Sequence, residues 1–121
     1  MKTSEDAADW YRRKTVSDAL SVNLADGVII IVFYNYQFSR SDPERSIDPF
    51  EIFASVSRNE VQDWIDRSER LMSSNFAVGD AIVEKSGKYE EIRDNYIASN
   101  PGFSKRTYSH AIYLGASKAC R

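Results

Sequence analysis

The chain has 121 residues, 42% of them apolar, and a formal net charge of −2. This length fits one domain with a single hydrophobic core, and the apolar content excludes a chain that stays disordered. The longest purely apolar run, residues 28–34, is far shorter than the roughly 20 residues that cross a bilayer as a helix, so no membrane-spanning segment is expected.

The two ends of the chain bear on its compartment. The first residues are polar and acidic, and they lack the basic start and apolar centre of a secretory signal. The single cysteine, Cys120, has no partner for a disulfide within the chain, which agrees with a reducing environment. Both observations predict a cytoplasmic protein.

Helix starts are indicated at two places in the first half of the chain. Residues 4–6 contain a serine and two acids before an apolar stretch, which predicts a short first helix with acids in its first turn. Ser57 and Glu60 have the spacing of a capping box, and an apolar stripe of helical period follows them up to Met72. We therefore expect a helix that begins at this point.

Residues 28–38 carry the main ambiguity of the fold. Their β-branched and aromatic side chains favour a strand. A strand needs a hydrogen-bonding neighbour, and the other candidate segment, residues 50–56, follows Asp48-Pro49, which is typical of a helix start. A helix-like spacing of apolar residues also leads into the segment from Val16. We favour a buried central helix, and the alternative is a 28–38/50–56 hairpin packed on helices.

The turn Asn100-Pro101-Gly102 separates two more expected helices. The first covers residues 88–99, and the second runs from a capping Ser104 to about residue 119, with small residues such as Gly115 where another backbone could approach closely. Residues 78–86 fit either a continuation of the same stripe or a break at Ser86-Gly87. Together the patterns predict a mainly α protein, with residues 1–121 forming a single domain and one compact bundle of five or six helices.

The charges are unevenly distributed along the chain. Residues 1–94 contain all 18 acids and 12 of the 16 Lys and Arg, whereas residues 95–121 contain four cations and no acid. Lys105 and Arg106 fall at the expected start of the last helix, where cations oppose the helix dipole. We therefore expect an acidic neighbour, supplied either by the preceding helix, at Glu90, Glu91 or Asp94, or by a partner.

Aromatic residues form a second candidate surface. The aromatics at positions 33, 34, 36 and 38 are too closely spaced for one side of a helix to hide them all, and Tyr suits an interface because its ring is apolar and its hydroxyl polar. The partner would be another protein or a second copy of the chain. The candidate interaction residues are Tyr34, Tyr36, Phe38, Lys105, Arg106, Tyr108 and His110.

No motif predicts a catalytic residue, a metal site or a cofactor. The acids of the 42–51 loop do not fit a calcium loop beginning at Asp42, because Ile47 and Phe53 occupy the positions that need Gly and Glu. His110 and Cys120 would lie about 15 Å apart along one helix, too far to share a zinc ion. The sequence also lacks a phosphate-binding loop, a dinucleotide fingerprint and a nucleophile elbow.

The function predicted by default is a non-enzymatic protein-interaction module, such as an inhibitor, an immunity-type protein or an adaptor. The first alternative is a nucleic-acid binder resembling a helix-turn-helix, with Lys105, Arg106 and His110 on its second helix, although a pI near 5.4 argues against phosphate contacts. The second alternative is a small acid/base enzyme that combines carboxylates with His110.

Overall fold

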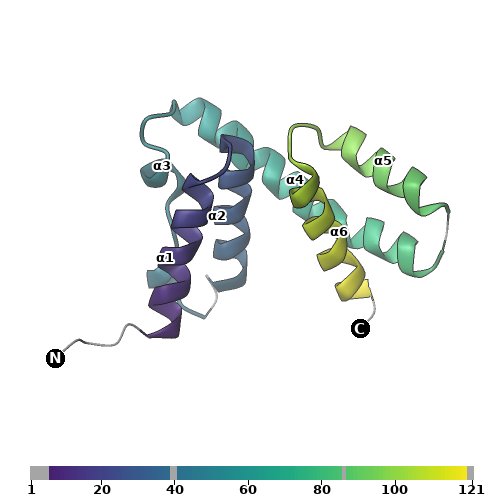
Figure 1. Cartoon of the computed structure of the whole chain (residues 1–121), viewed down its shortest axis with the longest axis horizontal. Helices are drawn as coiled ribbons and strands as arrows, with labels where there is room; N and C mark the ends of the chain where they lie inside the picture. The colour runs from purple at the N-terminus through teal and green to yellow at the C-terminus, as the bar shows by residue number, and fades with distance from the viewer. Residues whose placement is uncertain (1–5, 39–40, 86, 120–121) are drawn as a thin grey trace. The chain divides into compact units, whose positions relative to one another are not determined.

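A computed structural model describes residues 6–38, 41–85 and 87–119 (Figure 1). These residues form helices and no strand. The elements are α1 (Ala7–Leu20), α2 (Leu24–Phe38), the 3-10 turn Pro43–Arg45, α3 (Pro49–Ile52), α4 (Arg58–Val83), α5 (Tyr89–Ser99) and α6 (Lys105–Ala119). The predicted mainly α fold is confirmed. The alternative hairpin is wrong, because residues 28–38 lie within α2 and residues 50–52 within α3.

Side-chain caps begin the helices where the sequence indicates. The backbone N–H of Phe50 donates to Asp48 Oδ1 at 3.0 Å, and that of Glu60 donates to Ser57 Oγ at 3.2 Å. The N–H of Thr107 donates to Ser104 Oγ at 3.3 Å. Each bond satisfies a donor that the first turn of a helix leaves without an intrahelical partner.

Two helix boundaries bear on the sequence-based expectations. The length of α1 differs from the expected one, and the end of α4 decides between a continuous helix and a break. Asp6 caps α1 by accepting a hydrogen bond from Asp9 N at 2.8 Å, and α1 then runs for 14 residues, so the first helix is not short. Ser4 lies outside the described residues. After Val83 the chain leaves the helical conformation, and Lys85 has a φ of 56°. The helix therefore ends before Gly87, and the apolar stripe does not continue from α4 into α5.

The described chain divides into two compact units, residues 1–65 and residues 66–121. In the first unit, α1 and α2 pack side by side (Figure 1). The strand-like composition of α2 follows from its surroundings, since apolar side chains on several of its sides are covered by α1, the 47–56 segment and the start of α4. The core of the first unit consists of Ala19, Val28, Ile31, Tyr34, Ile47, Phe53 and Val61.

The second unit contains the rest of α4 with α5 and α6. A Cβ atom added at Gly79 would collide with the backbone of Gly115, and one added at Gly115 would collide with the carbonyl of Asn75. The backbones of α4 and α6 therefore touch where they cross, as the small residues of the last helix predict. No helix in the part of the chain that the structure describes is both long and apolar enough to span a membrane.

Candidate functional site

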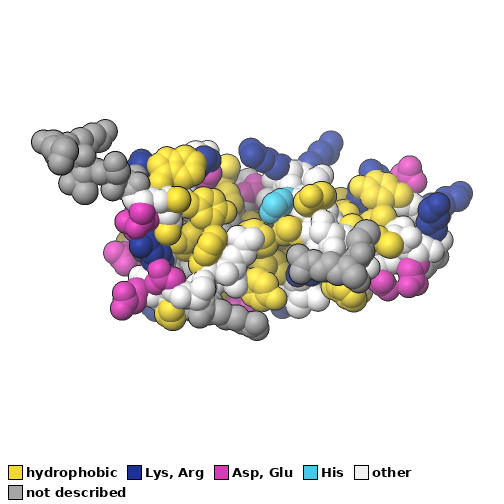
Figure 2. All heavy atoms as spheres, turned by 90° about the horizontal axis from the view of Figure 1, so that it is seen from below, with side chains coloured by type: hydrophobic (Ala, Val, Ile, Leu, Met, Phe, Trp, Pro, Cys, Tyr) yellow, Lys and Arg dark blue, Asp and Glu magenta, His cyan; other side chains and the backbone are white. Residues whose placement is uncertain are grey.

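The candidate site is the solvent-exposed side of α6. Tyr108, Ala111, Ile112 and Gly115 point into the second unit and are buried. On the other side, Arg106, His110 and Tyr113 are spaced i, i+4 and i+7 and form one exposed stripe, with Lys105 beside it. We call these four residues, Lys105, Arg106, His110 and Tyr113, the α6 face. Figure 2 shows hydrophobic side chains sharing the protein surface with Lys and Arg in the view drawn.

Tyr113 is the most exposed large hydrophobic side chain of the α6 face. Its side chain is 68% exposed, more than any other large hydrophobic residue among those described. The sequence reasoning missed this residue, although its spacing from Arg106 and His110 could have indicated it. A tyrosine in this position offers a partner apolar area together with a hydroxyl group.

The cations of the α6 face have no counter-charge within the described chain. No ion pair or hydrogen bond joins the side chain of Lys105 or Arg106 to a described residue, and the first turn of α6 has no acid. On α5, Asp94 Oδ1 pairs instead with Arg93 Nε at 3.1 Å. The two cations therefore face the positive end of the α6 dipole without an internal carboxylate to offset it.

The predicted aromatic residues occupy different environments. Tyr34 is 3% exposed and belongs to the core of the first unit, where its ring lies 4.9 Å from that of Phe38, which is partly buried. Tyr36 is 62% exposed. A buried ring offers no surface to a partner, which excludes Tyr34, while Tyr36 is exposed and Phe38 only partly so.

Tyr108 has a structural position as well. It is 5% exposed, and its hydroxyl donates to the carbonyl oxygen of Asn100 at 2.5 Å and accepts a hydrogen bond from the N–H of Phe103 at 3.2 Å. Tyr108 thus ties the 100–103 turn to α6. The sequence placed it among the interaction residues because helical spacing alone does not reveal which side of α6 the body of the unit covers.

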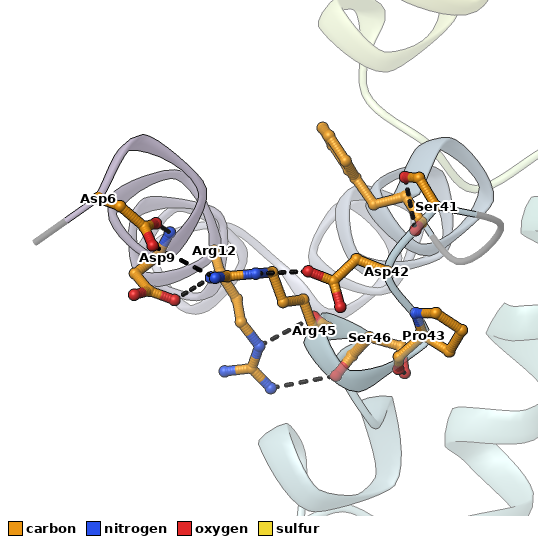
Figure 3. Close-up of polar contacts among 9 residues, drawn as sticks. Asp6, Asp9, Arg12, Ser41, Asp42, Pro43, Arg45 and Ser46 are labelled. Carbon is orange, nitrogen blue, oxygen red and sulfur yellow. Dashed lines mark hydrogen bonds and ion pairs between the residues drawn. The ribbon is translucent and has the colours of Figure 1, made fainter.

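Two acids of the 42–51 loop, Asp42 and Asp48, make contacts within the fold. Arg45 reaches three carboxylates: its Nε donates to Asp42 at 2.6 Å, and its terminal nitrogens contact Asp9 and, at 3.4 Å, Asp6 (Figure 3). We call these residues, Asp6, Asp9, Asp42 and Arg45, the Arg45 cluster. Hydrogen bonds to Asp9 and Asp42 raise the pKa of Arg45, while the backbone N–H of Asp9 lowers the pKa of Asp6.

Two further side chains fix the same loop to the helices. Arg12 of α1 donates to the carbonyl oxygens of Arg45 at 2.9 Å and Ser46 at 3.1 Å (Figure 3). The amide of Asn35 on α2 donates to Ile47 O at 2.7 Å and accepts from Ile47 N at 2.8 Å. The loop is therefore held to the first unit by hydrogen bonds, and Asp48 is engaged as a helix cap.

Neither a metal-binding cluster nor similarity to a known protein assigns a role to the described residues. Within the described ranges, no group of three or more His, Cys, Asp or Glu side chains is placed to hold a metal ion. Cys120 lies outside those ranges. No family model matches the chain, and neither a curated protein nor a solved structure is significantly similar to it.

Proposed function

We propose that the protein is a non-enzymatic interaction module, of the inhibitor, immunity or adaptor kind, and that its α6 face binds an acidic surface of a partner protein. One observation carries the proposal: Lys105 and Arg106 are exposed at the helix end where cations cost stability, and no described residue compensates them. Each misplaced cation costs about 0.3–1 kcal/mol. A partner's carboxylates would offset that cost on binding.

The composition of the α6 face suits a protein surface. Charged residues at the edge of an interface steer association and select the partner, and an exposed tyrosine supplies apolar contact area at a small cost in side-chain entropy. Lys105 and Arg106 provide the charge, and Tyr113 the contact area. Strong binding of duplex DNA typically uses 6–10 phosphate contacts, more than these cations supply.

Photo-crosslinking tests the proposal in cells. We expect a benzophenone amino acid at Tyr113 to capture one defined protein with an acidic surface, and the same amino acid at Phe76 to leave it uncaptured, because Phe76 is exposed on α4 and lies off the α6 face. The double variant K105E/R106E should reduce the capture at least tenfold.

A matched pair of variants controls for net charge. Lys85 and Lys88 are exposed in the same unit, and K85E/K88E changes the charge by the same amount, so it should retain the capture. Capture that survives K105E/R106E would contradict the proposal. So would capture that nuclease treatment abolishes, or a gel-shift titration at low salt in which mixed DNA binds wild type and not K105E/R106E, since both outcomes indicate a nucleic-acid binder.

A further inference from the structure

The second unit contains a pocket between α4 and the turn that follows α5. Arg67, Arg70, Ser99, Asn100 and Pro101 line it, and its volume is about 220 Å³. We infer that this pocket binds a phosphate group. None of its residues belongs to the α6 face, so the inference does not depend on the proposed function.

Two arginines form the α4 wall of the pocket. Arg67 and Arg70 are three residues apart on a regular helix, so they lie on the same side of α4, one turn from each other. Arg70 is exposed and makes no ion pair or hydrogen bond through its side chain with a described residue. Arg67 is half-buried and has another interaction in the chain, and it also lines the pocket.

The opposite wall is a fixed turn. Asn100 N donates to Ile97 O at 3.1 Å, and Asn100 Nδ2 donates to Tyr96 O at 3.0 Å. Carbonyls at the end of a helix repel an anion, but these two are already occupied by donors. Ser99 adds a neutral hydroxyl donor to the lining, and Pro101 stiffens the turn.

The volume and the charge of the pocket indicate the kind of ligand it binds. Pockets that enclose whole small molecules measure roughly 300–1,000 Å³, so a volume near 220 Å³ fits a single group better than an entire ligand. A phosphate monoester carries a charge of about −1.5 to −2 at pH 7 and presents three acceptor oxygens. That charge matches two guanidinium groups, whereas a carboxylate neutralises one. The planar fork of arginine also suits two-point contact with phosphate oxygens.

NMR titration of the full chain tests this assignment. Inorganic phosphate should give saturable shifts of the Arg70 side-chain N–H and of the Ser99 and Asn100 amides, while acetate at equal ionic strength should not. If the natural ligand is a phosphorylated side chain, O-phosphoserine should bind at least as tightly as inorganic phosphate. If the natural ligand is free phosphate, O-phosphoserine should bind more weakly. Because the second pKa of a phosphate monoester is about 6, O-phosphoserine should bind several-fold more tightly at pH 7.5 than at pH 5.5.

Variants separate the pocket from general charge attraction. Arg70→Gln should weaken phosphate binding about tenfold or more, and Arg70→Lys, which keeps the charge and loses the fork, should weaken it less. Arg106→Gln removes an equal charge outside the lining and should leave the affinity unchanged. Equal shifts with acetate, no saturation, or equal weakening by Arg70→Gln and Arg106→Gln would each overturn the inference.

Discussion

At the scale of single residues, polar side-chain contacts bind neighbouring segments of each unit together. The Tyr96 hydroxyl donates to the carbonyl oxygen of Leu71 at 2.5 Å, which joins α5 to α4. Burial raises the pKa of Tyr96 well above its usual range, so this hydroxyl keeps its proton at any ordinary pH. In the first unit, the Arg45 cluster joins α1 to the 42–46 loop.

The Tyr96 bond should have a measurable effect on stability. Removing the hydroxyl with Tyr96→Phe deletes one buried hydrogen bond and should lower the free energy of unfolding by about 1 kcal/mol in urea denaturation. Tyr113→Phe is the control, since that hydroxyl sits on a largely exposed ring and its loss should change stability by less than about 0.5 kcal/mol. Equal effects of the two variants would contradict the role given to Tyr96.

The Arg45 cluster should make stability depend on acid. The pKa of Asp6 is lowered in the folded state, first by the N–H of Asp9 and also by Arg45, so its ionised form favours folding. That contribution is fully present above the unfolded value of about 3.8 and is lost as the pH falls through the lower folded value.

Urea denaturation at pH 6, 4 and 3 measures this dependence. Wild type should lose more stability than Arg45→Gln between pH 4 and pH 3, because the variant lacks the guanidinium that favours the ionised carboxylate of Asp6. Parallel pH profiles for the two proteins would show that Arg45 does not stabilise the ionised carboxylate of Asp6.

At the scale of elements, helix starts could be predicted from the sequence, whereas contacts between residues far apart in the chain could not. Asp48, Ser57 and Ser104 mark helix starts because a cap bonds to a backbone N–H only two or three residues ahead. The helical state of α2 followed from the lack of a pairing partner and not from its propensity. Arg45 and Asp9, in contrast, are 36 residues apart, and no local pattern announces their contact.

The contact between α4 and α6 can be tested with Gly115→Ala. Backbone packing predicts that this variant is less stable than wild type, whereas helix propensity predicts that it is more stable. Intrinsic helix propensity alone would make Gly115→Ala stabilising by about 1 kcal/mol. The Cβ would collide with the backbone of Asn75, so we expect a loss of about 1–3 kcal/mol in the free energy of unfolding.

Gly87→Ala is the matched control for this substitution. The nearest atoms to a Cβ at Gly87 belong to Ile92 at 3.8 Å, which is ordinary van der Waals contact, so stability should stay the same or rise slightly. Stabilisation by Gly115→Ala would mean that the two helix backbones do not touch there.

At the scale of the whole molecule, the division into two units was not visible in the sequence. The boundary between residues 65 and 66 falls inside α4, so no Pro, Gly or polar linker marks it. The units differ in charge, with residues 1–65 at −4 and residues 66–121 at +2 by their Asp, Glu, Lys and Arg content. The Arg67 and Arg70 pocket likewise joins α4 to a turn some 30 residues later, beyond the reach of a local motif.

We propose that Lys105 and Arg106 are placed for a partner, at a cost to the stability of the isolated protein. The most direct test is the free energy of unfolding of K105E/R106E, measured beside wild type and K85E/K88E at low salt. Acids in the first turn of α6 favour its dipole. In K85E/K88E the acid after the end of α4 opposes a dipole and the acid at the N-cap of α5 favours one, so we expect K105E/R106E to gain about 1 kcal/mol over both proteins. A loss of stability specific to K105E/R106E would show that an internal carboxylate pairs with these cations, and would contradict the claim.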